Sequence, residues 1–142
     1  MTTEMLIPTL ESTRKIAAIT RQPGMQPFQD AAAQGRFVIP QCGGCGRFHW
    51  YPRVLCPFCF GDNVAWQAAT GRGTVYTYTV MRRAKPVYAI AYVKLQEGPV
   101  MMTNIVGCDF DAIRIGMEVS VLFQPAENGP LVPMFKPAGD VA

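Results

Sequence analysis

The sequence contains a single histidine, and charged residues are sparse. Among 142 residues His49 is the only histidine, and charged residues make up 16% of the chain. Acyl transfer and hydrolysis need a nucleophile beside a base that activates it, and histidine is the commonest such base. No Gly-rich phosphate-binding loop precedes a predicted helix, since Gly71-Arg72-Gly73 leads into a predicted strand. The sequence therefore favours a binding or scaffolding protein, with no catalytic residue of its own.

The chain also lacks an apolar run long enough to cross a bilayer, although 49% of its residues are hydrophobic. A spanning helix needs about 20 apolar residues in succession. Residues 1–4 have no cationic flank, and no apolar core of signal-peptide length follows them. We therefore expect no membrane association and a cytoplasmic location. In a reducing cytosol, paired cysteines indicate metal ligands before they indicate disulfides.

A large net charge is absent as well. The formal charge is +3, which by itself does not indicate a nucleic-acid partner. The charges are unevenly distributed, because residues 36–94 contain eight cations and one anion, Asp62. This basic middle favours a phosphate-bearing ligand or an acidic partner surface. Solvated loops are the alternative explanation.

Four of the five cysteines form two closely spaced pairs. Two residues separate the members of each pair, and ten residues separate the pairs, which are Cys42, Cys45, Cys56 and Cys59. Each Cys-x2-Cys turn points two thiolates at one point, so two such knuckles supply the tetrahedral four-sulfur set that zinc prefers. Glycines at 43, 44 and 46 allow backbone amides to approach the sulfurs. The spacing predicts one zinc ion held by these four thiolates.

The predicted zinc site is structural, because four thiolate ligands leave no coordination position open for water or substrate. Iron is the main alternative metal, since rubredoxins use a similar pair of knuckles, and disulfides are a further alternative. His49 is an alternative ligand, but four better-spaced sulfurs are already present. Cys108 stands alone beside Asp109, where a buried small hydrophobe is favoured over a nucleophile.

The remaining sequence predicts one short helix and five strands. Residues 27–34 start with Pro27 and stop at Gly35, which is typical of a helix, and residues 12–20 show a weaker helical pattern. Runs of β-branched and aromatic residues predict strands over 75–81, 87–95, 100–106, 117–123 and 131–135. The last run contains Pro133 and therefore belongs at an edge. Five short strands at this spacing suggest a small closed barrel.

Short motifs in both halves of the chain resemble the zinc-ribbon/OB-fold proteins encoded beside thiolases, known as domain of unknown function 35. In the first half the matching motifs are residues 28–35, Gln41-Cys42-Gly43-Gly44-Cys45-Gly46, Tyr51-Pro52-Arg53 and Cys56-Pro57-Phe58-Cys59. In the second half they are residues 71–79, 95–98 and 115–119. The likeness covers residues 26–136 and depends on the order and spacing of these motifs.

The resemblance implies a mainly β fold with three parts. These are an N-terminal extension with a short helix (1–35), a rubredoxin-like zinc ribbon (36–66) and a five-stranded OB-fold barrel (67–142). It also implies a non-catalytic zinc-binding subunit that scaffolds a thiolase-like acyl-CoA enzyme. The implied complexes contain a thiolase, a related acyltransferase or an aldolase. In some of them the OB part helps to hold a coenzyme A thioester, which is therefore an expected cofactor at the partner interface.

Two features of the barrel agree with that role. In the 87–95 strand, residues 87, 89, 91, 93 and 95 can face the interior, which leaves Tyr88, Ile90 and Tyr92 as an outer apolar stripe. Either a partner covers this stripe, or the ribbon or helix packs on it. The basic hairpin tip, Arg82, Arg83 and Lys85, is predicted to contact the phosphates of coenzyme A, with a solvated loop as the alternative.

Two other functions stay open. Zinc ribbons and OB barrels both bind single-stranded nucleic acid, and Tyr88 and Tyr92 can stack bases. However, Lys94 is the only cation of the 87–95 strand and the 100–106 strand has none, which argues against nucleic acid. A free-standing acyl-CoA carrier or hydrolase would depend on Cys108 or His49.

Arg47 and Arg53 lie near the knuckles. They are expected to pair either with the four thiolates or with partner carboxylates.

Overall fold

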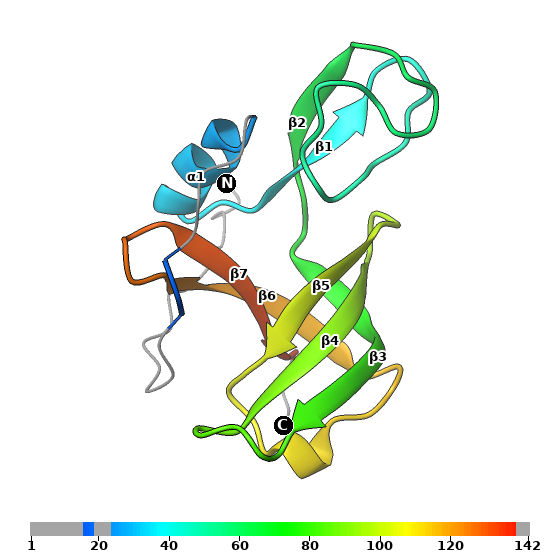
Figure 1. Cartoon of the computed structure of the whole chain (residues 1–142). Helices are drawn as coiled ribbons and strands as arrows, with labels where there is room; N and C mark the ends of the chain where they lie inside the picture. The colour runs from blue at the N-terminus through cyan, green and yellow to red at the C-terminus, as the bar shows by residue number, and fades with distance from the viewer. Residues whose placement is uncertain (1–15, 19–23, 139–142) are drawn as a thin grey trace, which may run out of the picture.

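The computed structural model describes residues 16–18 and 24–138, and it shows a helix, a two-stranded ribbon and a barrel (Figure 1). Helix α1 spans Gln26–Ala33, and the ribbon consists of β1 (Val38–Cys42) and β2 (Val64–Ala68). The barrel strands are β3 (Arg72–Met81), β4 (Tyr88–Leu95), β5 (Val100–Ile105), β6 (Glu118–Pro125) and β7 (Leu131–Pro137), with the short 3-10 helix η1 (Phe110–Ala112) before β6. The predicted mainly β fold is confirmed.

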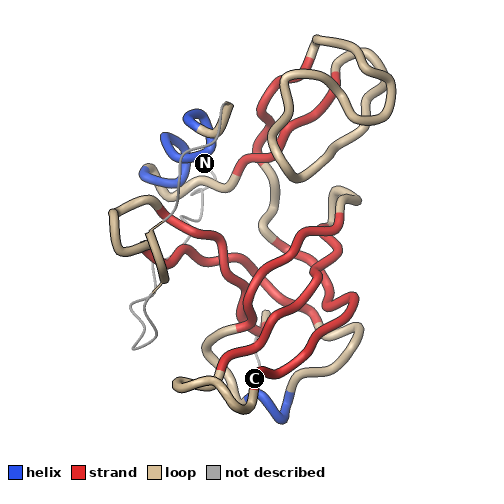
Figure 2. The backbone as a smooth tube through the Cα atoms, in the orientation of Figure 1, coloured by secondary structure: helices blue, strands red, loops and turns tan. Residues whose placement is uncertain are grey.

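The ribbon is an antiparallel hairpin in which β1 and β2 pair from Val38 opposite Ala68 to Cys42 opposite Val64. Cys42 is the last residue of β1, and the long loop that follows it carries the other three knuckle cysteines (Figure 2). Neither strand was predicted from the sequence. Pro40 is tolerated in β1 because the bonds to β2 come from alternate residues, such as Phe37 with Ala69 and Gly43 with Asn63, so the Pro40 nitrogen faces away from β2.

The five barrel strands close in the order β3, β4, β5, β7, β6. β7 therefore lies between two neighbours, and its predicted edge position is wrong. β7 nevertheless accommodates Pro133, because β5 and β7 pair at a single position, Ile105 opposite Phe135. Pro133 faces β5 but lies outside that pair, so its missing N–H removes no hydrogen bond between the strands. Its carbonyl instead accepts a hydrogen bond of 2.9 Å from Thr103 Oγ1.

Alternation along β4 sorts its side chains between the barrel core and the surface. Ala89, Ala91, Val93 and Leu95 are buried as predicted, whereas Val87 precedes the strand and is exposed. On the outer side Tyr88 and Ile90 are half-buried and Tyr92 is exposed. The stripe expected from the sequence therefore exists on the outside of the barrel.

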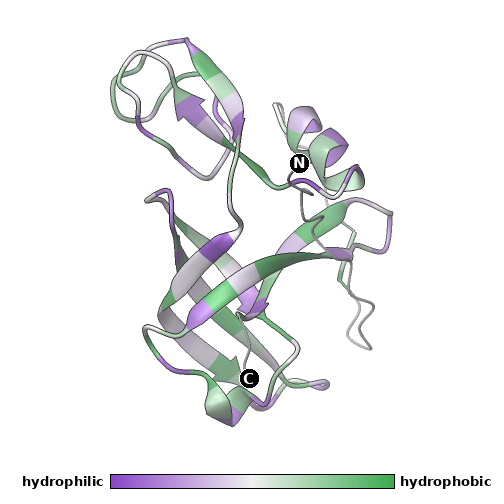
Figure 3. Ribbon diagram, turned by 180° about the vertical axis from the view of Figure 1, so that it is seen from behind, coloured by the Kyte–Doolittle hydropathy of each residue, from purple (hydrophilic) through white to green (hydrophobic). Residues whose placement is uncertain are grey.

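An aromatic cluster around Phe28 joins the three parts of the molecule. The ring of Phe28, on α1, is 1% exposed, and its centroid lies 6.1 Å from Phe37, 5.5 Å from Trp50 and 6.3 Å from Trp66 on the ribbon side. On the barrel side it lies 6.1 Å from Phe123 of β6. The start of β1, which carries the buried Val38 and Ile39, is correspondingly hydrophobic (Figure 3). One buried side chain thus contacts helix, ribbon and barrel together.

Hydrogen bonds from Gln29 fix α1 to β7. Gln29 Nε2 donates to the carbonyl of Leu131, and the amide of Leu131 donates back to Gln29 Oε1, both at 3.1 Å. Near the same hairpin, Ile16 forms a parallel bridge with Ala126, and residues 16–18 are not helical, although a helical turn was expected there. The rest of the predicted 12–20 helix lies outside the described residues.

Replacing Phe28 by alanine should lower the free energy of unfolding by about 3–5 kcal/mol, because it leaves a cavity between all three parts. Urea unfolding followed by the fluorescence of Trp50 and Trp66 measures this loss. The control Tyr76→Ala removes a side chain that is 62% exposed, and should change stability by no more than about 0.5 kcal/mol. Equal stability of the two variants would contradict a central role for Phe28.

Candidate metal centre and adjoining surfaces

The structure brings the four predicted cysteine ligands together. Their Sγ atoms all lie within 4.8 Å of one another, with 3.6 Å between Cys42 and Cys59 and 3.7 Å between Cys45 and Cys56. A tetrahedron of sulfurs around zinc, with bonds of about 2.3 Å, has edges of about 3.8 Å. All five cysteines of the chain are described, and none is in a disulfide. The side chains present therefore fit a tetrahedral metal ion.

Backbone amides of each knuckle point at its first sulfur. The amides of Cys45 and Gly44 donate to Cys42 Sγ at 3.5 and 3.3 Å, and together they lower the pKa of that thiol despite its burial. Burial raises the pKa of Cys56, but the amides of Cys59 and Phe58 outweigh it and lower the value to about 7. These two thiols therefore lose their protons more readily than an ordinary cysteine, and the thiolate is the form that binds a metal.

Cys59 behaves in the opposite way. The amide of Gly61 lowers its pKa, but the neighbouring Cys42 sulfur, burial and the other two sulfurs raise it to about 11. Four thiolates this close repel one another, so all four ionise together only beside a cation. The donor set thus calls for a metal ion, which would supply structural stabilisation with no open position for substrate.

His49 stands outside the metal centre. Its Nδ1 lies 2.9 Å from the carbonyl oxygen of Tyr51, and the residue is 5% exposed. With Nδ1 donating to that carbonyl, Nε2 is left as an acceptor, and it has no hydrogen-bond partner among the described residues. The role of His49 as an alternative ligand is not supported by this geometry.

Cys108 and His49 do not form a catalytic pair. His49 lines a cavity together with Val100 at the start of β5, whereas Cys108 follows the end of that strand. A strand of six residues is about 17–20 Å long, so the two residues lie near opposite ends of it. Cys108 packs against the barrel core, and burial, together with the adjacent Asp109 carboxylate, raises the pKa of its thiol. The thiol is held in its unreactive form, as expected for a small hydrophobe.

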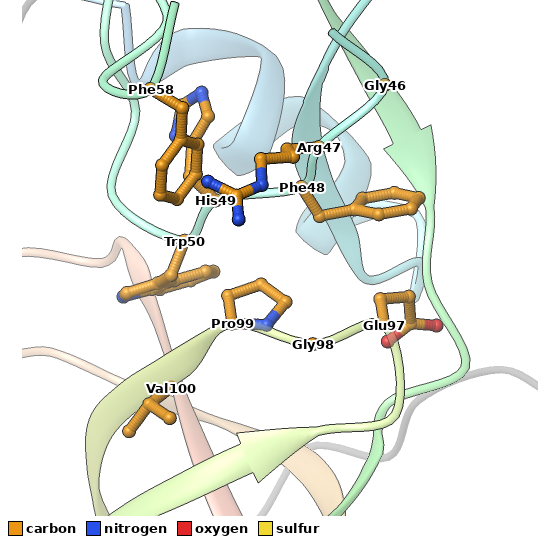
Figure 4. A pocket seen from close by; sticks show the side chains of 10 residues that line it. All are labelled: Gly46, Arg47, Phe48, His49, Trp50, Phe58, Glu97, Gly98, Pro99 and Val100. Carbon is orange, nitrogen blue, oxygen red and sulfur yellow. The ribbon is translucent and has the colours of Figure 1, made fainter.

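A cavity of about 590 Å³ separates the knuckle loop from the β4–β5 turn (Figure 4). Arg47 and Phe58 line the ribbon side, where the guanidinium lies 4.4 Å from the ring centroid. Glu97 lines the barrel side and accepts the amide of Thr70 at 2.9 Å. The predicted strands over 87–95 and 100–106 place a connection around Gly98, but not its approach to the ribbon, because that approach depends on how the two parts pack.

A second groove, of about 390 Å³, opens on the outer side of the barrel. Its lining is mainly apolar and comes from β4, β5, β7 and the knuckle loop: Trp50, Tyr88, Ile90, Met102, Thr103, Asn104, Val132 and Pro133. Trp50 of the knuckle loop therefore borders the same groove as Tyr88 and Ile90 of the predicted stripe. Tyr92 and the neighbouring Met102 are 44% and 61% exposed. The ribbon part thus adjoins the stripe, and its coverage by a partner stays a prediction.

The basic hairpin tip lies at the end of the barrel where β3 leads into β4. Arg82 forms an ion pair of 2.7 Å with Asp111, the middle residue of η1, with both side chains largely exposed. Within residues 16–18 and 24–138 this is the one ion pair between side chains, so Arg83 and Lys85 have no carboxylate partner there. Both are exposed. The structure therefore anchors one cation of the tip and leaves two for other contacts.

Comparisons with known proteins agree with this architecture. The family model for the ChsH2 rubredoxin-like zinc ribbon domain matches residues 29–65, and that for the ChsH2 C-terminal OB-fold domain matches residues 66–124. A DUF35 domain-containing scaffold protein of Methanothermobacter thermautotrophicus is 32% identical over 91 residues, which cover 59% of this chain and 68% of the relative. The chain belongs to the DUF35 family. Its hairpin is a zinc ribbon and its barrel is an OB-fold.

Two further relatives of this DUF35 chain are informative. A probable enoyl-CoA hydratase alpha subunit of Thermomonospora curvata is 35% identical over 114 residues, or 77% of this chain but only 36% of the relative's length. The solved Ltp2-ChsH2(DUF35) aldolase contains a chain with 31% identity and a TM-score of 0.74, which covers 86% of this chain and 100% of that one. In the described part of this DUF35 chain, no helix is long and apolar enough to span a membrane.

Replacing Cys56 by serine should reduce the bound metal from about one ion per chain to well below one, because three thiolates bind the ion more weakly than four. Loss of the ion should in turn unfold the ribbon. Elemental mass spectrometry measures the metal and distinguishes zinc from iron, while circular dichroism follows unfolding. Cys108→Ser is the matched control and should keep its ion. Full metal content and unchanged unfolding in the Cys56 variant would contradict the assigned ligand set.

Proposed function

We propose that this chain is a non-catalytic accessory subunit that scaffolds a thiolase-like or aldolase-type acyl-CoA enzyme. Among its relatives are an aldolase complex, a probable enoyl-CoA hydratase subunit and a scaffold protein. The metal centre holds the ribbon, and the partner supplies the chemistry. The described residues support this division, because the four cysteines form a closed ligand set and His49 and Cys108 lie far apart.

The observation that carries the proposal is the apolar outer face of β4 and β5. Tyr92 and Met102 lie directly opposite each other in the β4–β5 ladder, so their exposed side chains are neighbours. Val100, 41% exposed, lies two residues before Met102 on the same face of β5, and the apolar groove continues from Met102 toward β7. Adjoining apolar side chains on two paired strands are typical of a protein interface. This face is the proposed contact with the enzyme.

A coenzyme A thioester at that interface is the second part of the proposal. Arg83 and Lys85 are exposed and lack carboxylate partners within the described residues. Asp111 pairs with Arg82, so the other two cations of the tip are the ones left for a ligand. Guanidinium and ammonium groups are suitable donors to a diphosphate or 3′-phosphate. Their task in the complex would be to bind and orient the cofactor.

Replacing Tyr92 by glutamate should weaken binding to the acyl-CoA enzyme at least about tenfold, because it buries a charge in an apolar contact. Co-expression of the full chain with the enzyme, gel filtration and calorimetry provide the measurement. The control is Tyr76→Glu, because Tyr76 lies on β3 and is 62% exposed. Equal binding by the two variants would remove the β4–β5 face from the interface.

The same wild-type preparation tests the competing nucleic-acid function. A labelled single-stranded oligonucleotide should bind weakly or not at all. Tight binding that weakens steeply with salt would instead favour a nucleic-acid-binding protein over an accessory subunit. Absence of any complex with the enzyme would count against the accessory role itself.

Replacing Arg83 by glutamate should raise the KM for the acyl-CoA substrate of the complex several-fold, because a carboxylate repels the phosphates. Metal content and complex formation should not change, since Arg83 contacts neither the cysteines nor the apolar face. Steady-state kinetics of the assembled complex measure the effect. The control is Arg36→Glu, at the exposed end of the linker from α1 to β1. A wild-type KM in the Arg83 variant would eliminate the phosphate contact.

A further inference from the structure

The second cysteine knuckle exposes a cluster of large apolar side chains, which we call the knuckle tip. Its members are Val54 (76% exposed), Leu55 (48%), Phe58 (49%) and Phe60 (75%). None of them belongs to the buried core of the protein or packs against it. Four such side chains within one short loop are more than scattered surface residues, so the cluster calls for an explanation.

Phe60 adds a second observation, because its backbone is in the left-handed region with φ at 64°. It is the one non-glycine residue in the described part of the chain with positive φ. This conformation disfavours a bulky side chain and is ordinarily occupied by glycine. The turn is fixed by hydrogen bonds of 2.9 Å from the amide of Phe60 to Cys56 and from the amide of Cys56 to Gly61. The fold therefore tolerates backbone strain to hold an exposed aromatic ring at a fixed place.

Strain that serves no packing contact indicates function. The core gains nothing from Phe60, and glycine would form the same turn at lower cost. We infer that the knuckle tip is a second docking surface, separate from the β4–β5 face, for an apolar socket on the partner enzyme. This inference rests on the proposed function, because the partner is the enzyme that the accessory subunit binds.

Charge indicates the chemistry of the socket's rim. Arg53 directly precedes the tip, and Arg47 lies over Phe58 from the first knuckle, with 4.4 Å between guanidinium and ring centroid. Both arginines are exposed, and neither forms an ion pair within the described residues. An apolar surface flanked by unpaired cations is complementary to an apolar socket bordered by carboxylates.

The same charges argue against a second copy of this chain as the occupant. A two-fold contact between knuckle tips would bring Arg47 and Arg53 of both copies into one interface. Like charges at such a contact repel each other. A carboxylate-bordered partner surface satisfies the apolar side chains and the arginines at once.

The test is Phe60→Gly in the full, metal-loaded chain. Glycine relieves the strained backbone, so the melting temperature should equal or exceed that of the wild type. Affinity for the acyl-CoA enzyme, measured by calorimetry, should nevertheless fall about tenfold or more, because a buried aromatic anchor is lost. If Phe60 had only a structural role, the substitution would lower the melting temperature and leave the affinity unchanged. Tyr76→Ala, an exposed aromatic on the barrel, is the control and should change neither quantity.

Arg53→Glu provides an independent arm. It should weaken binding and reduce the salt dependence of the affinity, because one attractive charge contact becomes repulsive. If the wild type binds the enzyme and both variants bind it as tightly as the wild type does, the knuckle-tip inference is wrong and the proposed function stands. If wild type binds no such enzyme, both are wrong. Binding of wild type but not Phe60→Gly to phosphatidylserine vesicles, with enzyme affinity unchanged, would overturn the inference in favour of a lipid surface.

Discussion

The contacts of Phe28 are the interaction on which the rest of this structure depends. A ribbon with five residues in each strand is marginal by itself, and a barrel of five strands has no need of a ribbon. Phe28 joins them, because its ring touches Trp50 and Trp66 of the ribbon part and Phe123 of the barrel. With the Gln29–Leu131 hydrogen bonds, it gives the two parts a defined relative orientation.

The metal centre completes this arrangement from the opposite end of the ribbon. Backbone amides favour ionised Cys42 and Cys56, while mutual repulsion opposes ionisation of Cys59 until a cation is present. Metal binding and ribbon folding are therefore coupled. Because Trp50 belongs to the knuckle loop and also lines the outer groove of the barrel, an ordered ribbon also shapes the proposed partner-binding face. This coupling explains how a site without an open coordination position contributes to function.

Much of this architecture is predictable from sequence, for identifiable reasons. Cysteine spacing indicates the ligand set, and strict alternation in β4 indicates which of Ala91 and Tyr92 faces the core. Other features depend on tertiary packing. β1 contains Pro40 and lacks a β pattern, so it was not predicted. β7 lies between β5 and β6 although it contains Pro133, because its pairing with β5 is too short to involve that residue. The positive φ of Phe60 matches that of Gly46, the residue that directly follows the second cysteine of the first knuckle, so the repeated knuckle indicates the conformation although phenylalanine itself does not.

Phe28 joins helix, ribbon and barrel, and the proposed scaffold role requires that the exposed apolar side chains of the barrel and of the knuckle tip contact the partner. Hydroxyl-radical footprinting of the metal-loaded chain, free and in complex with the acyl-CoA enzyme, tests this account most directly because it reports side-chain exposure residue by residue. The account predicts that oxidation of Tyr92, Met102 and Phe60 falls on complex formation, while Tyr76, which is 62% exposed, stays equally reactive. Unchanged oxidation of Tyr92 and Met102 in a formed complex would contradict it.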